Sequence, residues 1–299
     1  MKFRPISSDL LTARLEPPKP GCRLVLDTDT YNEIDDPFAL VYALRSPELR
    51  LEAVYAAPFH NDRSDGPKDG MERSYGQICE ILELLGEERP VFRGSERWMT
   101  GPDGPVDSPA ARDLIARAMS SEEPLYVAAI GAPTNVASAI LLEPAIREKI
   151  TVVWLGGHGL HMPKTDEFNM AQDYYASRTL LESGVPLVLL PCNGVVSHLL
   201  ITIPELETTL AGKGKCGQYL LDITRDYMQK HPCASKVIWD IATIGWLCNA
   251  GWYQSRLIPS PVLNPDMTYS VSEDPERHPI RYINFLSRDQ IFEDLYQKM

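Results

Sequence analysis

The stretch that decides the fold reads Leu24-Val25-Leu26-Asp27-Thr28-Asp29-Thr30-Tyr31-Asn32-Glu33-Ile34-Asp35-Asp36-Pro37. Its first residues form a short apolar run, which is typical of a buried strand. The acidic pair followed by proline indicates a helix start. The stretch therefore carries five carboxylates on one strand-to-helix turn, and such a group repels itself unless it holds a cation or shares protons. It predicts either a helix cap with a solvated turn or a hard-cation site at the carboxyl end of a parallel strand.

Short apolar runs alternate with helical patterns along the rest of the chain. The apolar runs predict strands at 51–57, 90–92, 125–130, 150–155 and 186–190. Apolar residues at helical spacing predict helices at 71–85, 110–119, 136–142 and 174–182. This alternation favours an α/β fold with a mostly parallel, Rossmann-like central sheet and flanking helices. Beyond residue 195 the pattern is mainly helical, so we expect a helical C-terminal portion. We expect a single domain over residues 1–299, with residues 1–21 as an N-terminal extension.

Each expected strand ends in a polar or glycine-bearing turn. These turns are Asp27/Asp29, His60/Asn61, Arg93/Gly94, Gly131 to Asn135, and Gly156 to His161. Ligands of such sheets bind at the carboxyl ends of the strands. We therefore expect the turns to form one crevice.

The composition restricts the class of partner. The chain of 299 residues has 44% hydrophobic and 23% charged residues and a net charge of -12, which argues against nucleic acid or an anionic membrane as its main partner. Its first residues lack the long apolar run of a signal peptide or a transmembrane helix. Six scattered cysteines without C-x-x-C spacing are typical of reduced thiols, so we expect a cytoplasmic protein.

Other acidic or phosphate-binding motifs fit the sequence less well. The nucleophile loop of haloacid-dehalogenase-type phosphatases needs a later strand that ends in an acidic pair, whereas here the pair follows at once. An EF-hand loop beginning at Asp27 needs glycine at its sixth position and glutamate at its twelfth, where Asn32 and Phe38 stand. The segment 212–215 lacks the spacing and the preceding strand of a phosphate-binding loop.

Several motifs together resemble one enzyme family, the inosine-uridine-type nucleoside hydrolases. The motifs occur in the family's order, and the matches run from about Arg23 to Asp240. They are Asp27-Thr28-Asp29 with Asp35-Asp36, the turn Gly131-Ala132-Pro133-Thr134-Asn135, Leu155-Gly156-Gly157, Glu167-Phe168-Asn169, and Trp239-Asp240. Each motif alone has low specificity, but their common order is a strong signal. The resemblance implies the nucleoside hydrolase fold and a homo-oligomer, either a dimer or a tetramer.

The resemblance also implies a calcium ion. Its ligands would be Asp29, Asp36, Asp240 and the backbone carbonyl of Thr134, completed by a water and two ribose hydroxyls. Calcium prefers this kind of hard-oxygen set.

Other residues would hold the ribose. Asp27 would steady the site, and Asp35 would accept a hydrogen bond from the ribose 2′-hydroxyl. Asn61, Glu167 and Asn169 would bind further ribose hydroxyls.

The implied reaction is hydrolysis of an N-glycosidic bond. Calcium would lower the pKa of its bound water, and Asp29 would take the proton as general base. Attack at C1′ would pass through an oxocarbenium-like state that the carboxylates stabilise, releasing the base and ribose.

The sequence departs from the family pattern at two places. Five residues instead of the usual three separate Asp29 from the acidic pair, which brings Asn32 and Glu33 toward the ribose. Trp239 replaces the histidine that protonates the leaving base in many members, and this favours a purine stacked on the indole. Trp98 would provide the opposite aromatic face.

The acid that would replace the missing histidine stays open. His60, His158 and His161 lie on the expected crevice turns, and Tyr227 and His231 precede Trp239 on a helix. We expect a calcium-dependent, purine-preferring ribonucleoside hydrolase. The alternatives are hydrolysis of another N-ribosyl compound such as nicotinamide riboside, and a non-catalytic ribose- or nucleoside-binding protein.

Overall fold

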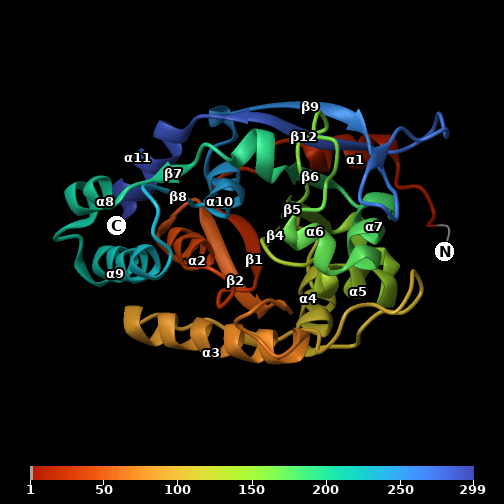
Figure 1. The fold of residues 1–299 in the computed structure, drawn as a ribbon. Coiled ribbons are helices and arrows are strands. Elements are labelled where there is room, and N and C mark those ends of the chain that lie inside the picture. The colour runs from red at the N-terminus through yellow and green to blue at the C-terminus, as the bar shows by residue number, and fades with distance from the viewer. Residues whose placement is uncertain (1–2) are drawn as a thin grey trace.

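The computed structural model describes residues 3–299 and is built around one eight-stranded sheet (Figure 1). The strand order is β3-β2-β1-β4-β5-β6-β12-β9. The bounds are β1 (Cys22–Thr28), β2 (Leu49–Ala56), β3 (Val91–Arg93), β4 (Leu125–Ala129), β5 (Ile150–Leu155), β6 (Leu187–Leu190), β9 (Tyr253–Pro259) and β12 (Pro279–Leu286). Neighbouring strands are parallel except for β9, which runs antiparallel to β12. The predicted mostly parallel α/β fold is confirmed.

Helices connect the strands and cover both faces of the sheet. They are α1 (Ser8–Leu15), α2 (Asp35–Arg45), α3 (Pro67–Leu85), α4 (Pro109–Met119), α5 (Thr134–Leu142), α6 (Phe168–Gln172), α7 (Tyr174–Glu182), α8 (Ile203–Leu210), α9 (Gly214–Lys230), α10 (Ile241–Cys248) and α11 (Arg288–Lys298). Two short ribbons pair β7 (Leu200–Ile201) with β8 (Lys236–Val237), and β10 (Val262–Leu263) with β11 (Tyr269–Ser270). Among the described residues, no helix is both long and apolar enough to cross a membrane.

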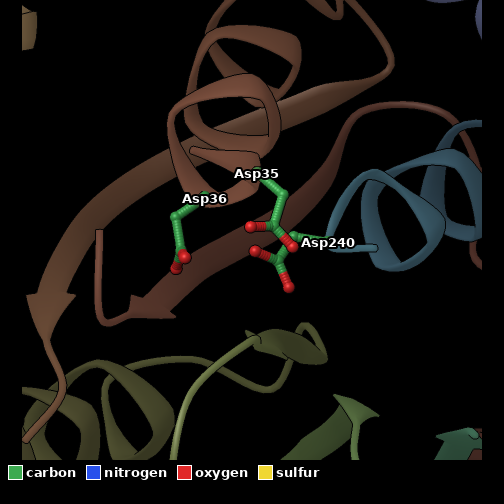
Figure 2. A group of neighbouring side chains, drawn as sticks. All are labelled: Asp35, Asp36 and Asp240. Carbon is green, nitrogen blue, oxygen red and sulfur yellow. The ribbon is translucent and has the colours of Figure 1, made fainter. Parts of the chain in front are cut away.

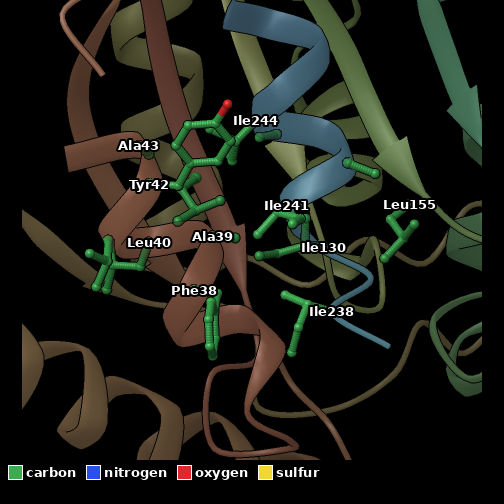
Figure 3. Close-up of a cluster of buried hydrophobic side chains, with 14 of the residues drawn as sticks. Phe38, Ala39, Leu40, Tyr42, Ala43, Ile130, Leu155, Ile238, Ile241 and Ile244 are labelled. Atoms are coloured by element: carbon green, nitrogen blue, oxygen red, sulfur yellow. The ribbon is translucent and has the colours of Figure 1, made fainter. Parts of the chain in front are cut away.

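The core has two parts, one on each face of the sheet. Alternate side chains of β1 point to opposite faces, so Leu24 and Leu26 join one cluster and Val25 joins the other. The first cluster includes residues of α2, α9, α10 and α11, and the second includes residues of α4, α5 and α7. In Figure 3, Phe38 and Tyr42 of α2 lie near Ile241 and Ile244 of α10. This packing fixes the start of α10 beside the start of α2.

Two C-terminal strands and a terminal helix were not predicted. The expected helical C-terminal portion contains α8, α9, α10 and α11, but β9 and β12 also lie in it and extend the main sheet beyond β6. Part of the N-terminal extension, helix α1, contacts the start of β5 and the residues just before it. Helix α1 is tied there because the Arg14 guanidinium donates to the Glu148 carbonyl at 3.0 Å, and Thr151 donates to the Arg14 carbonyl at 3.1 Å.

Candidate active site

A cavity of about 500 Å³ opens at the carboxyl ends of the central strands. The order of strands reverses between β1 and β4, and such a switch point is where open α/β sheets bind ligands. Two of the five predicted turns contribute described lining residues, Asn61 from one and His158 from the other. The other three turns contribute none, so the expected single crevice is present only in part. The cavity is also lined by Asn32, Asp35, Asp36, Ile130, Leu155, Glu167, Asn169, Trp239 and Asp240.

Three buried carboxylates meet in this cavity (Figure 2). Asp35 and Asp36 begin α2, and Asp240 immediately precedes α10. Each residue offers one oxygen that lies within 4.8 Å of the others, and none of the three is more than 4% exposed. Both helix N-termini meet here, so their dipoles favour the negative charge. The sequence predicts Asp36 and Asp240 as metal ligands and Asp35 as a ribose-binding residue. In the structure, all three carboxylates lie in one cluster.

Asp29 is buried and is not among the described residues that line the cavity. Its side chain is 1% exposed, contacts the Asp36 carboxyl group, and has no hydrogen-bond partner on either carboxylate oxygen among the described residues. A glycine makes room for it, because a Cβ at Gly131 would stand 3.1 Å from the Asp29 carboxyl carbon. A buried carboxylate with two unbonded oxygens is costly unless a cation or a proton compensates it.

Burial and mutual repulsion raise the pKa values of this group. Burial is the main cause throughout, and the neighbouring carboxylates add to it for Asp29 and Asp240, whose pKa values rise well above the ordinary range. The pKa rises to about 6 for Asp36 and to about 7 for Asp35. A divalent cation among these oxygens would remove the repulsion, and carboxylates are ligands that calcium accepts. The donor set therefore fits a calcium ion.

Asp27 is held by a hydrogen-bonded chain behind the site. The Asn135 amide donates to an Asp27 oxygen at 2.8 Å, and the Asn135 oxygen accepts from the backbone and hydroxyl of Ser95. Burial raises the pKa of Asp27 to about 7, and the bond from Asn135 opposes that rise. The other Asp27 carboxylate oxygen has no hydrogen-bond partner among the described residues, and the role of Asp27 in the site stays a prediction.

Glu167 and Asn169 also line the cavity. Glu167 caps α6, because its carboxylate accepts from the backbone N–H groups of Gly157, Asn169 and Met170 at 2.9 to 3.1 Å. The Asn169 amide nitrogen donates to the carbonyls of Ile130 and Leu155, both at 3.1 Å. These bonds fix both side chains in the cavity wall, and the Asn169 side-chain oxygen is its remaining polar atom.

The turn between β1 and α2 forms a further part of the wall. Asn61 donates to the Asn32 side-chain oxygen at 2.7 Å, and the Arg63 guanidinium donates to the Asn32 backbone carbonyl at 3.0 Å. Glu33 contacts Lys236 and Tyr227. The enlarged turn is therefore held by side chains from three other parts of the chain.

Aromatic side chains line the cavity beside Asp240. Trp239 is partly exposed there, and the Tyr227 and His231 rings stack with centroids 4.5 Å apart. His158 also lines the cavity, and burial lowers the pKa of its imidazole.

Trp98 and His60 are not among the described residues that line the cavity, and their roles stay predictions. The loop that carries Trp98 is drawn toward α7, because the neighbouring Met99 N–H donates to Asp173 at 2.9 Å and Met99 packs in a small separate core. The backbone of His60 is paired with the Gln172 amide at 2.8 and 3.1 Å, and its ring lies near Ser64.

Thr134 begins α5 and is fully buried, and its hydroxyl donates to Asp173 at 2.9 Å.

Sequence reasoning did not single out Cys192, Asp62 or Lys236. Cys192 and Asp62 line the cavity, and Lys236 lies beside it. Cys192 could have been found because it follows an expected strand. No motif or neighbouring residue in the sequence marks Lys236.

Comparison with known proteins accounts for this geometry. The model of the family described as inosine-uridine preferring nucleoside hydrolase matches residues 24–277. The chain belongs to this family. Its members hydrolyse N-glycosyl compounds, and the resemblance found in the sequence motifs is thereby confirmed.

Curated relatives of this nucleoside hydrolase differ in their named specificity. The non-specific ribonucleoside hydrolase RihC of Salmonella schwarzengrund (strain CVM19633) is 27% identical over 245 residues, which cover 75% of this chain and 78% of the relative. The pyrimidine-specific ribonucleoside hydrolase RihB of Escherichia coli (strain SE11) is 26% identical over 255 residues, covering 76% and 78%.

Solved structures share the fold. A plant nucleoside hydrolase, the PpNRh1 enzyme, superposes with a TM-score of 0.75 at 21% identity, over 94% of this chain and 99% of that one. The purine-preferring ribonucleoside hydrolase from Gardnerella vaginalis gives a TM-score of 0.73 at 21% identity, over 92% and 97%.

Proposed function

We propose that this nucleoside hydrolase is calcium-dependent and cleaves the N-glycosidic bond of ribonucleosides, with a preference for purines. The observation that carries the proposal is the group of buried carboxylates, in which Asp29 has two unbonded oxygens and Asp35, Asp36 and Asp240 converge. When bound, calcium supplies positive charge that acidifies a water and fixes sugar hydroxyls. Asp29, Asp36 and Asp240 would hold it, together with the backbone carbonyl of Thr134.

The chain's own residues divide the remaining work. Asp29 accepts a proton from the water that attacks C1′, since neither of its carboxylate oxygens has a hydrogen-bond partner among the described residues. Asp35, Asn61 and Asn169 bind ribose hydroxyls from different walls of the cavity. As the bond to the base breaks, the nearby carboxylates stabilise the positive charge on the sugar.

The base would lie against Trp239, which is partly exposed beside Asp240. An indole offers a larger stacking surface to a purine than to a pyrimidine. Asn32 and Glu33 line the same cavity and would contact the sugar or the base.

A steady-state screen tests this proposal. We expect inosine and guanosine to be hydrolysed with higher kcat/KM than uridine and cytidine, and EDTA to abolish turnover until calcium is restored. Trp239→Ala should raise the KM for inosine about tenfold, because one aromatic stacking contact is lost. Chelator-insensitive hydrolysis would overturn the calcium requirement, and equal kcat/KM for uridine and inosine would overturn the purine preference.

The charge of the cavity favours a second candidate substrate, a riboside with a cationic base such as nicotinamide riboside. Seven acidic side chains line the cavity, and Arg63 is the one arginine or lysine among its described lining residues. A cleft with such an excess of negative charge attracts cations. A pyridinium base also leaves as a neutral molecule, so it needs no proton donor. A higher kcat/KM for nicotinamide riboside than for inosine would establish this candidate, and absence of its hydrolysis would eliminate it.

A further inference from the structure

The wall that carries Trp239 also carries a histidine. The main cavity and an adjoining surface pocket share three lining residues, which are Tyr227, His231 and Trp239. The rings of Tyr227 and His231 stack with their centroids 4.5 Å apart and their planes inclined by 30°. Because the base is proposed to stack on Trp239, His231 lies on the same part of the wall as the base site.

The end of α9 orients the His231 ring. His231 directly follows this helix, and its Nδ1 lies 3.2 Å from the Tyr227 backbone carbonyl. A carbonyl only accepts hydrogen bonds, so Nδ1 carries the hydrogen in this contact. The same carbonyl accepts from the His231 backbone N–H at 2.8 Å. The other ring nitrogen, Nε2, makes no hydrogen bond to any of the described residues.

The surroundings of His231 favour a positively charged ring. The ring stands at the carboxyl end of α9, where the helix dipole stabilises a cation, and seven acidic side chains line the main cavity. Lys230 and Lys236 line the adjoining pocket, but they are paired with Asp226 and Glu33. A charged imidazolium carries a hydrogen on both nitrogens, so Nε2 has a proton to donate.

Other proton donors on the cavity wall are already engaged. His158 is the other histidine among the described lining residues, and both of its ring nitrogens face Asn193, each at 3.4 Å from a nitrogen of that residue. Burial also lowers the pKa of the His158 imidazole, which favours its neutral form. The Tyr227 hydroxyl donates to Glu33 at 3.2 Å. Of the two lining histidines, His231 is thus the one with a ring nitrogen free to face the base.

We propose that His231 is the catalytic residue that protonates the leaving base. The inference rests on the proposed hydrolysis of ribonucleosides. As the C1′–N bond breaks, its electron pair passes to the base. The Nε2–H bond of His231 breaks as an N–H bond forms on a ring nitrogen of the base, so the base leaves as a neutral molecule. The His231 ring is exposed and regains a proton from solvent, while Asp29 releases the proton that it took from the water.

A comparison of two leaving groups at saturating calcium tests the proposal. The base of inosine needs a proton to leave, whereas 4-nitrophenyl riboside releases a stable phenolate that needs none. We expect His231→Gln to lower kcat for inosine about 10²- to 10⁴-fold and to leave kcat for 4-nitrophenyl riboside nearly unchanged. Retained turnover of the second substrate also shows that the variant is folded. Equal losses with both substrates, or an unchanged kcat for inosine, would overturn the proposal.

The substitution His231→Phe separates proton donation from packing. Phenylalanine keeps an aromatic ring beside Tyr227 but has no proton to donate, so we expect the same selective loss with inosine. If His231 only supports the wall by stacking, His231→Phe would hydrolyse inosine at the normal rate, and the proposal would fail. Gln229→Ala is the control, because Gln229 is exposed on the last turn of α9 and is not among the described residues that line the main cavity. Its kcat should not change with either substrate.

The unmodified protein separates this inference from the proposed function. If it hydrolyses neither inosine nor 4-nitrophenyl riboside in the presence of calcium, the proposed function fails and the role of His231 fails with it. If it hydrolyses inosine and requires calcium, but the His231 variants lose kcat equally with both substrates, the proposed function stands and only the role of His231 is refuted.

Discussion

Asp29 is the residue on which the proposed chemistry depends most. It is buried, and both of its carboxylate oxygens lack a hydrogen-bond partner among the described residues. We expect Asp29→Asn to lower kcat about 10²- to 10⁴-fold, because an amide cannot accept the proton from water. Steady-state hydrolysis of inosine measures the effect. Asp289→Asn is the control, because that side chain is 90% exposed, and its kcat should not change. An Asp29→Asn enzyme with normal kcat would exclude the role of general base.

Individual site residues could be predicted where a motif fixes them. Asp29, Asp36 and Asp240 belong to motifs in a recognisable order, and the structure brings their side chains together. Trp98 is not among the described lining residues, because composition marks a loop without stating which way the loop turns. The pairing of Glu33 with Lys236 joins residues far apart in sequence, and no local pattern encodes it.

At the scale of elements, one buried ion pair ties β1 to β2 and α4. The Arg23 guanidinium makes two bonds to Glu52, at 2.8 and 3.0 Å, and also donates to the carbonyls of Arg117 and Glu123. We expect Arg23→Met to lower the free energy of unfolding by about 3 kcal/mol, because the partly buried Glu52 loses its two hydrogen bonds and keeps only the longer ion pairs to Arg50 and Arg117, both at 3.6 Å. Urea denaturation measures this loss, with a nearly unchanged m-value.

The control for this prediction is an exposed pair. Lys68 and Glu96 are 61% and 59% exposed, so Lys68→Met should change the stability by less than about 1 kcal/mol. If both substitutions lower the free energy of unfolding equally, the buried Arg23–Glu52 pair stabilises the fold no more than the exposed pair does.

The segment before β12 carries a histidine that makes stability depend on pH. Burial, reinforced by the charges of Arg277 and Arg147, lowers the pKa of His278 from 6.5 to about 4. Between these two values the unfolded chain binds the proton and the folded chain does not, so stability falls as the pH drops from 6.5 toward 4. The full loss is about 3 kcal/mol.

The substitution His278→Asn isolates this contribution. We expect the variant to lose less stability than the unmodified protein between pH 7 and pH 4, measured by urea denaturation across that range. Parallel stability curves for the two proteins would contradict the assignment. The comparison is needed because the site carboxylates, whose pKa values are raised, act in the opposite direction.

Whole elements could be predicted where their hydrophobic pattern was regular. β4 and β5 are fully buried, mainly apolar runs and were predicted nearly to the residue. β9 has several exposed residues and pairs along one edge only, and β12 mixes buried residues with exposed polar ones. Such strands lack a continuous apolar run, so tertiary pairing determines them instead, of β12 with β6 and of β9 with β12.

At the scale of the whole molecule, calcium is expected to stabilise the fold. A ligand that binds only the folded chain adds about 2.7 kcal/mol at a concentration of 100 times its Kd. For a chain of this size that corresponds to a rise in Tm of about 5 °C. Scanning calorimetry with calcium and with EDTA measures it. Asp36→Asn and Asp240→Asn should abolish the rise in Tm, and a persistent rise in both variants would place the ion elsewhere.

The homo-oligomer stays a prediction, and light scattering would measure the oligomeric state.

The acidic cluster joins residues that are far apart in sequence, because Asp35 and Asp36 begin α2 and Asp240 precedes α10. An exposed turn at 211–213 lies between them in sequence. Two fragments cut at this turn would each hold an incomplete set of ligands, and the C-terminal fragment would also hold β9 and β12. Recovered calcium binding on mixing would therefore report that the two halves have reassembled, which makes the site a natural probe for fragment complementation.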